Sequence, residues 1–309
     1  MALPKLLPFR NESKNFDFCF AFRSLIRNFA RRMEYCINVR GGLMNLAEPW
    51  VMGILNCTPD SFFAGSRKQT EREIAERAQQ IVAEGGRIID VGAFSTRPGA
   101  QEVSLEEECN RLRNALTIVR QEVPEAIVSV DTYRPLVARR CVEEWGADMV
   151  NDVSEGGQTG IVNTPINEEG SMFETVARLK VPYILMSVKP TVEAMLKAWA
   201  EEVLQLRAMG AKDIILDPGF GFGKSKDENF DVLSQLDKLT VMDLPLLVGV
   251  SRKSMIWRTL DGTPESALNG TTVLNTIALQ KGASILRVHD VREAVETVKL
   301  FNKVNKINS

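Results

Sequence analysis

Polar and charged side chains interrupt the apolar runs of this chain at similar positions, each near the end of a short run. They are Asn56, Asp90, Asp131, Asn151, Asp152, Ser187, Asp217, Ser251, Arg252, Lys253, Arg287, His289 and Asp290. Carboxylates and amides suit a nitrogen heterocycle with N–H donors and ring acceptors, whereas cations suit phosphate or diphosphate. Gathered in one place, the set predicts a site for a nitrogen heterocycle that carries an anionic leaving group.

The positive charge of this set comes from Lys253 and Arg287, with Arg97 or Arg252 as a further contributor. His289 is the only histidine, so a zinc site built from several histidines is excluded. The segment Gly219-Phe-Gly-Phe-Gly-Lys224 has the composition of a phosphate loop. It lacks the spacing G-x-x-x-x-G-K-[ST], and it therefore predicts no nucleotide site.

Each carboxylate of the set also has a structural interpretation. Asp131 or Asp217 can cap the helix that follows its strand. Asp90 can orient neighbouring backbone groups, and Asp152 and Asp290 can brace neighbouring cations. The functional interpretation is favoured because these residues occur together at successive strand ends.

From residue 50 onward, short apolar runs alternate with longer amphipathic segments, which indicates repeated βα units. The predicted strands are 50–56, 87–93, 126–131, 148–152, 182–188, 213–217, 245–250 and 285–289. The predicted helices include 71–84, 105–122, 135–145, 192–209, 229–239 and 268–281, with a closing helix after Asp290. Parallel strands that are each followed by a helix predict a (β/α)8 TIM barrel, and a doubly wound open sheet is the alternative.

A TIM barrel places the carboxyl ends of its strands, and the loops that follow them, around one mouth. The loops 58–66 and 94–99 carry Pro, Gly and hydroxyl residues, and we expect them to close over a substrate. The segment 36–46 predicts a small hairpin that plugs the barrel floor. The segment 154–170 is longer than a typical βα loop and is expected to move.

The composition limits the classes of function. The 309 residues carry a formal net charge of −2, so no global basic field attracts nucleic acid. No run of about 18 apolar residues is present, and we expect no membrane-spanning helix. The five cysteines lack CxxC pairing, which predicts free thiols in a reducing cytoplasm.

Residues 1–32 form a predicted basic extension, separate from a single domain at 33–309. This extension contains seven Lys and Arg residues but only two acidic residues, Glu12 and Asp17, with apolar residues interleaved. Such a leader can be a transit peptide or a surface-binding helix. The alternative is a flexible tail or an upstream segment, with Met33 as the functional start.

Several longer segments point to one family. They are Met52-Gly-Ile-Leu-Asn-Cys-Thr-Pro-Asp-Ser-Phe62, Ile89-Asp-Val-Gly-Ala-Phe-Ser-Thr-Arg-Pro-Gly99, Ser129-Val-Asp-Thr132, Asn151-Asp152, Leu216-Asp-Pro-Gly-Phe-Gly-Phe-Gly-Lys224, Leu247-Val-Gly-Val-Ser-Arg-Lys-Ser254 and Arg287-Val-His-Asp290. In this order and at this spacing, from about residue 36 to the end, the chain resembles the dihydropteroate synthase family. The resemblance implies a transferase that condenses 6-hydroxymethyl-7,8-dihydropterin diphosphate with p-aminobenzoate, giving 7,8-dihydropteroate and diphosphate for folate biosynthesis.

The resemblance also implies a role for each matching residue. The pterin pocket would contain Asp131, Asn151, Met186, Asp217 and Lys253. Diphosphate would be bound by Asn56, Arg287 and His289, and Asn56 would also contact Mg²⁺. The p-aminobenzoate site would contain Phe62, Thr96, Pro98, Lys253 and Ser254. The catalytic residues implied by the match are Asp131, Lys253, Asp60 and Arg97.

The same resemblance implies Mg²⁺ as cofactor, a cytoplasmic homodimer, and sulfonamides as competitors of p-aminobenzoate. It implies a mechanism without a protein nucleophile, in which Mg²⁺ and the cations stabilise the departing diphosphate.

Two regions depart from the family pattern. Members commonly carry Met-His-Met after the fifth strand, whereas this chain reads Met186-Ser-Val-Lys-Pro190. The loop 154–170 is also longer than usual. These departures leave open a non-catalytic or divergent pterin-binding paralogue. A pterin-dependent methyltransferase on the same barrel is a second alternative.

Overall fold

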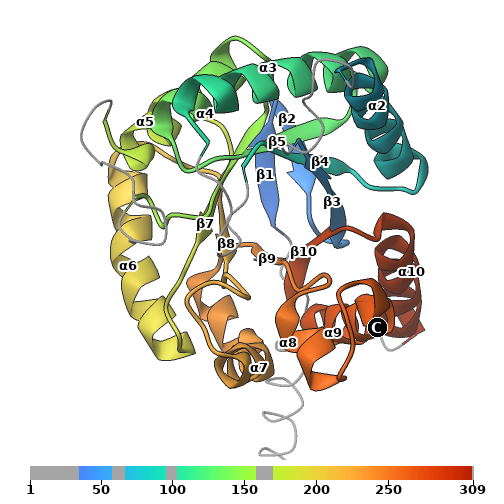
Figure 1. The fold of residues 1–309 in the computed structure, drawn as a ribbon. Helices are drawn as coiled ribbons and strands as arrows, with labels where there is room; N and C mark the ends of the chain where they lie inside the picture. Colours follow the sequence, from blue (N-terminus) through green and yellow to red (C-terminus); the bar gives the residue numbers. More distant parts are fainter. Residues whose placement is uncertain (1–34, 58–66, 95–102, 158–169, 308–309) are drawn as a thin grey trace, which may run out of the picture. The chain divides into compact units, whose positions relative to one another are not determined.

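Eight parallel strands close into a barrel around which the helices are arranged (Figure 1). The computed structural model describes residues 35–57, 67–94, 103–157 and 170–307. The barrel strands are β3 (Trp50–Asn56), β4 (Ile88–Gly92), β5 (Ile127–Asp131), β6 (Met149–Asp152), β7 (Tyr183–Met186), β8 (Ile214–Asp217), β9 (Leu246–Val248) and β10 (Ala283–Val288). Because β10 pairs with β3, the sheet has no open edge. The predicted TIM barrel is confirmed, and the doubly wound open sheet is wrong.

Helices separate the strands along the described chain. They are α2 (Arg67–Ala83), α3 (Leu105–Glu122), α4 (Pro135–Glu143), α5 (Met172–Leu179), α6 (Val192–Ala208), α7 (Lys226–Ser234), α8 (Ser254–Thr259), α9 (Leu268–Gln280) and α10 (Val291–Ile307), with 3-10 helices η2 (Leu236–Met242) and η3 (Glu265–Ala267). Hydroxyl side chains begin four of the helices by accepting an N–H from the residue three positions later. These N-caps are Ser104, Ser171, Thr191 and Ser225.

The predicted single helix at 229–239 is wrong. Helix α7 ends at Ser234, and Gln235 leaves helical geometry with φ −114° and ψ 13°. The chain then continues as η2. Residues three apart eclipse one another in a 3-10 helix, so Leu236 and Leu239 are both buried in the core.

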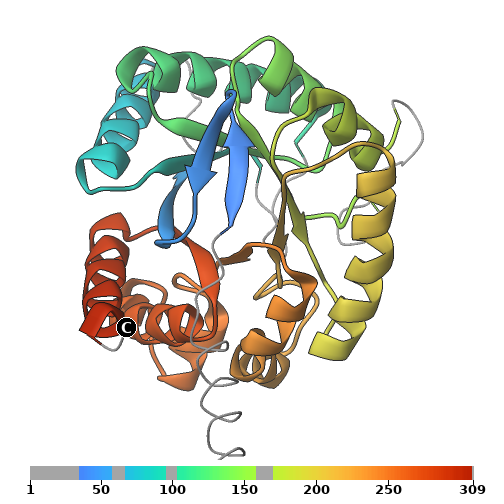
Figure 2. The same cartoon turned by 180° about the vertical axis from the view of Figure 1, so that it is seen from behind.

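An antiparallel hairpin of β1 (Cys36–Val39) and β2 (Gly42–Asn45) lies across the barrel, as Figure 2 shows in blue. Its apolar side chains pack against residues from the interior of the barrel strands, in one cluster. This cluster comprises Ile37, Val39, Met44, Leu46, Met52, Ile88, Met149, Ile184, Ile215, Leu247 and Ile285. The predicted hairpin plug at 36–46 is therefore confirmed.

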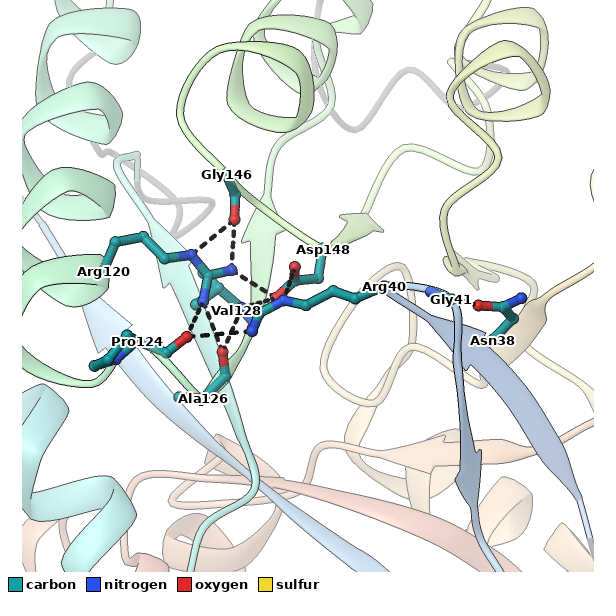
Figure 3. Close-up of polar contacts among 9 residues, drawn as sticks. All are labelled: Asn38, Arg40, Gly41, Arg120, Pro124, Ala126, Val128, Gly146 and Asp148. Carbon is teal, nitrogen blue, oxygen red and sulfur yellow. Dashed lines mark hydrogen bonds and ion pairs between the residues drawn. The ribbon is translucent and has the colours of Figure 1, made fainter.

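The hairpin is attached to the barrel through the carboxylate of Asp148 (Figure 3). Nε of Arg40, in the hairpin turn, lies 2.6 Å from Oδ1 of Asp148, and Nη2 of Arg120 lies 2.6 Å from Oδ2. The backbone N–H of Val128 donates to the same Oδ2 at 2.8 Å. Because Asp148 precedes β6, this cluster lies at the amino ends of the strands, opposite the predicted site.

The predicted basic extension at 1–32 lies outside the described residues. Among the residues that are described, no helix is long and apolar enough to span a membrane.

Candidate active site

Strand register brings the predicted site residues to one end of the barrel. Asp131 on β5 pairs with Asn151 on β6, and Met186 on β7 pairs with Asp217 on β8. Asn56 ends β3 and is exposed there. Because all these strands are parallel, their carboxyl ends surround one mouth. The predicted convergence of these residues on that mouth is confirmed.

An ion-pair network centred on Arg287 crosses this mouth. Nε of Arg287 lies 2.7 Å from Oδ2 of Asp90, and Nη2 lies 2.7 Å from Oδ2 of Asp131. Nδ2 of Asn151 donates to the same oxygen of Asp90 at 3.1 Å. Asp90 thus binds two side chains from other strands, so the interpretation that it only orients backbone is wrong. Sequence reasoning found the residue but not this role.

Three acceptor oxygens in this network are buried and have no hydrogen-bond donor among the described residues. They are Oδ1 of Asp90, Oδ1 of Asp131 and Oδ1 of Asn151. Buried polar atoms are almost always hydrogen-bonded in native proteins. An adjacent set of unsatisfied acceptors therefore predicts a ligand that brings N–H or O–H donors.

Burial controls the protonation of this network. It raises the pKa of Asp131 to about 7, against the opposing charge of Arg287 and with support from Asp90. Burial alone would lower the pKa of Arg287, but Asp90 and Asp131 outweigh it and the pKa is raised. Arg287 consequently stays cationic, whereas burial shifts Asp131 toward its protonated form.

Lys253 provides a second cation at the mouth. Its Nζ donates to the carbonyl oxygen of Phe220 and lies 4.6 Å from the ring centroid of Phe222. Burial lowers the pKa of Lys253 to about 8, and Asp217 opposes this change. Conversely, burial raises the pKa of Asp217 and Lys253 opposes it. The two groups are electrostatic partners. Ser254, the next residue, begins α8.

Asp217 and Met186 also contact the loop that follows β8. Oδ1 of Asp217 accepts the N–H of Gly219 at 2.8 Å, so its capping interpretation holds for the turn rather than for a helix. A Cβ at Gly219 would lie 2.9 Å from Cγ of Met186, and φ there is +66°. Only glycine fits this position without strain. The loop is therefore packed directly on the predicted pocket residues.

His289 lies beside Ser251 at the end of β10. Its Nδ1 is 3.1 Å from Oγ of Ser251, and its backbone N–H donates to the same oxygen at 3.1 Å. Burial and then Arg287 lower the pKa of His289 to about 4. The imidazole is therefore neutral at pH 7 and acts as a hydrogen-bonding group rather than as a cation.

Three other residues of the predicted set, Arg252, Asp290 and Asp152, have structural partners. Arg252 binds Asp290 through Nε and Nη2 at 2.9 and 2.8 Å, so it does not add a free cation to the mouth. The bracing role considered for Asp290 is confirmed. For Asp152 that role is wrong, because its carboxylate accepts from the loop residues Ser154 and Gly156 and from the hydroxyl of Tyr183.

Five predicted site residues lie outside the described residues: Asp60, Phe62, Thr96, Arg97 and Pro98. Conversely, the structure brings Glu155 and Lys224 to the mouth, and sequence reasoning did not select either. Glu155 lies three residues after Asp152, the end of strand β6, and Lys224 ends the glycine-rich segment. Their positions close to a strand end and to the glycine-rich segment could have identified both residues from the sequence.

Comparisons with known proteins agree on one family. Residues 52–289 match the family described as Pterin binding enzyme. The curated dihydropteroate synthase of Escherichia coli (strain K12) is 37% identical over 276 residues, which cover 84% of this chain and 93% of that protein. A solved structure of Xanthomonas albilineans dihydropteroate synthase with 4-aminobenzoic acid has a TM-score of 0.78 at 32% identity, covering 88% of this chain and 98% of that chain. Yersinia pestis dihydropteroate synthase in complex with a sulfonamide drug has a TM-score of 0.76 at 32% identity, covering 88% and 100%.

Proposed function

The chain belongs to the pterin binding enzyme family, and from this membership we infer that it is a dihydropteroate synthase. It is a transferase that condenses 6-hydroxymethyl-7,8-dihydropterin diphosphate with p-aminobenzoate in folate synthesis. The structural observation that carries this function is the set of buried, unsatisfied acceptors on Asp90, Asp131 and Asn151 beside the Arg287 cation. A pterin supplies the missing N–H donors, and its diphosphate meets the cation.

The pterin pocket consists of Asp131, Asn151, Met186, Asp217 and Lys253. Asp217 accepts from the N–H edge of the pterin, because an ionised carboxylate offers two acceptor oxygens. Burial raises the pKa of Asp217, and the nearby charge of Lys253 opposes that rise and so favours the ionised form. Met186 adds an apolar surface to the same pocket. The pocket thus combines hydrogen-bond acceptors with one flat apolar contact, as a fused heterocycle requires.

Arg287 and His289 bind the diphosphate. A guanidinium has five N–H donors, and Asp90 and Asp131 accept from two of its nitrogens, so further donors are available for phosphate oxygens. In the reaction the bond between the methylene carbon and the diphosphate oxygen breaks, and the aniline nitrogen of p-aminobenzoate bonds to that carbon. Negative charge grows on the diphosphate beside Arg287, while the carboxylates of the pocket stabilise the positive pterin.

Mg²⁺ is the proposed cofactor, with Asn56 as its protein contact. Among the described residues no group of three or more His, Cys, Asp or Glu side chains can hold a metal. This fits Mg²⁺, which is commonly bound by one or two protein oxygens together with substrate phosphates. Asn56 is exposed at the end of β3 and offers an amide oxygen there. When bound, the ion would neutralise charge on the diphosphate.

The p-aminobenzoate site involves Lys253 and Ser254, and it includes Phe62, Thr96 and Pro98 from outside the described residues. Asp60 and Arg97, also outside them, complete the proposed catalytic set with Asp131 and Lys253. A sulfonamide drug binds the Yersinia pestis relative. Since sulfonamides mimic p-aminobenzoate in shape and charge, they target this enzyme at the same site.

A cytoplasmic homodimer is the proposed form of the protein. The described cysteines Cys36, Cys57, Cys109 and Cys141 are free thiols, which supports a reducing compartment. Exposed apolar side chains on the adjacent helices α9 and α10 support a subunit interface there. They are Val273, Leu300 and Val304. Light scattering of the purified protein tests this proposal. The mass of two chains is expected, and the mass of one chain would contradict the homodimer.

The test of the function is direct detection of dihydropteroate from the purified chain with pterin diphosphate, Mg²⁺ and p-aminobenzoate, together with diphosphate release. Product that depends on both substrates is the expected result. Pterin binding without product would instead favour a non-catalytic paralogue, the alternative suggested by Ser187 in place of the family's usual histidine. An Asp217→Ala variant serves as the matched control, since it removes the proposed pterin acceptor but leaves the Arg287 network in place.

A further inference from the structure

A buried polar cluster joins the end of β7 to the loop after β6, and the proposed function leaves it without a role. Oγ of Ser187 donates to Oε1 of Glu155 at 2.8 Å, and the backbone N–H of Lys189 donates to Oγ at 3.2 Å. Oε2 of Glu155 lies 3.5 Å from Nζ of Lys189. Glu155 and Ser187 are both 0% exposed. Since burying a carboxylate is costly, a role for Glu155 is indicated.

The backbone at Glu155 supports the same conclusion. Its φ is +54°, in the left-handed region that side chains with a Cβ rarely adopt. The carboxylate of Asp152 holds the turn by accepting the N–H groups of Ser154 at 2.7 Å and Gly156 at 2.9 Å. Strained backbone of this kind persists where the surroundings enforce it, often at functional sites. Here the strained turn directs Glu155 toward Ser187.

Ser187 in turn contacts the pterin pocket. Its backbone N–H donates to the carbonyl oxygen of Asp217 at 2.8 Å. Nζ of Lys224 donates to the carbonyl oxygens of Ser187 and Gly219, both at 3.1 Å. The N–H of Gly219 then donates to Oδ1 of Asp217 at 2.8 Å. A continuous set of hydrogen bonds therefore links Glu155, through Ser187 and Lys224, to the Asp217 carboxylate.

Electrostatics connect the same residues. Burial lowers the pKa of Lys224 to about 8, and Asp217 and then Glu155 are the anions that most oppose this lowering. Glu228 on α7 contributes less. Glu155 therefore helps Lys224 to remain protonated while it holds the carbonyl groups beside Asp217.

We propose that Glu155 is a positioning residue for the pterin pocket, which acts through Ser187 and Lys224 to hold the Asp217 carboxylate in the orientation that binds the heterocycle. Ser187 is the hydrogen-bonding intermediate between the loop and the pocket, and its hydroxyl does not itself contact substrate. This inference rests on the proposed function, in which Asp217 binds the pterin.

The test uses the full chain and the variants Glu155→Gln, Ser187→Ala and their double variant. Glu202→Gln is the matched control. Glu202 lies on α6 in the same buried region, where burial and then Glu155 raise its pKa to about 7, but Ser187 donates to Glu155 instead. For each protein we would measure the dissociation constant for the pterin diphosphate without p-aminobenzoate, the KM for both substrates, kcat and Tm.

We expect Glu155→Gln, which removes the charge of the acceptor, and Ser187→Ala, which removes the hydrogen bond itself, each to weaken pterin binding about tenfold, the scale of one charge-assisted hydrogen bond. The KM for p-aminobenzoate should change less than about twofold, because the effect is confined to the pterin pocket. The double variant should bind pterin about as weakly as either single variant, since both act through one connection. Glu202→Gln should bind pterin as the unsubstituted protein does.

Unchanged pterin binding in both single variants would overturn the inference. So would equal losses for both substrates accompanied by a lower Tm, or multiplying losses in the double variant. If Glu155→Gln does not fold, Ser187→Ala alone decides. Because pterin binding is measured without condensation, a chain that binds pterin but makes no dihydropteroate would refute the proposed function and leave this inference to be judged separately.

Discussion

Asp148→Asn should destabilise the protein without changing its substrate affinity. The carboxylate of Asp148 accepts from Arg40 and Arg120, both at 2.6 Å, and from the N–H of Val128 (Figure 3). Asparagine keeps the size of the side chain but removes the charge. Both guanidinium groups would then lie together at the barrel floor without their shared anion.

The magnitude follows from burial and charge. Removing one partner of a buried ion pair costs about 3–5 kcal/mol. Arg120 and Arg40 have 20% and 38% of their side-chain surface exposed, and solvent screens the more exposed of these pairs. We therefore take the lower limit, about 3 kcal/mol of unfolding free energy. For a domain of this size that corresponds to a decrease in Tm of about 6 °C.

Calorimetry or urea unfolding measures the effect, and steady-state kinetics serves as the internal control because the proposed pterin pocket lies at the opposite end of the strands. Asp213→Asn is the matched variant. Asp213 accepts one exposed hydrogen bond, from the N–H of Asn38 at 2.8 Å, so its Tm should change by less than about 2 °C. A change in Tm of less than about 2 °C for Asp148→Asn would refute the reasoning. It would mean that the carbonyl oxygens of Ala126 and Gly146 satisfy the arginines by themselves.

Other predictions concern the site. Lys253→Ala should reduce kcat/KM by about 100-fold, the usual loss for one electrostatic group, and an effect below about threefold in steady-state assays would contradict the role of Lys253. His289→Gln should flatten the pH dependence of stability: the folded pKa of about 4 lies below the ordinary 6.5, so the unfolded chain binds this proton more readily and stability is lost as pH falls from 6.5 to 4. The slope should decrease by up to about 1.4 kcal/mol per pH unit in urea titrations, and an unchanged slope would show that His289 has the same pKa in the folded and the unfolded protein. A sulfonamide should raise the KM for p-aminobenzoate without lowering kcat, whereas inhibition that added p-aminobenzoate does not reverse would place the drug elsewhere. Chelation of Mg²⁺ should abolish turnover, and full activity in chelator would exclude the proposed cofactor.

The strands were predictable because their signal is local. An apolar run that ends in Asn, Asp or Ser is visible along the chain, and the observed strands agree with the predicted ones to within a few residues. The hairpin was predictable for the same reason, since Gly41-Gly42 lies between two apolar patches. The break between α7 and η2 was not predictable, because it depends on how Leu236 and Leu239 fit the core.

The sequence selected the candidate site residues by their positions at strand ends and in motifs, whereas it did not predict their partners. Arg287 binds Asp90 across 197 positions of the chain, and Arg252 binds Asp290 across 38. No local pattern shows that Arg287 lies at the candidate site whereas Arg252 is paired with Asp290 beside it. In the same way, the role proposed for Glu155 depends on the hydrogen bond that it accepts from Ser187, which only the tertiary structure shows.

The sequence by itself thus determined the family, the barrel and the set of polar residues at its mouth, because periodicity and motif order are properties of the chain. The tertiary structure alone decided which acceptors remain unsatisfied, which cations are already paired, and which carboxylates are buried. These properties depend on distances and solvent exclusion between segments that are far apart in sequence, and they exist only once the barrel has closed.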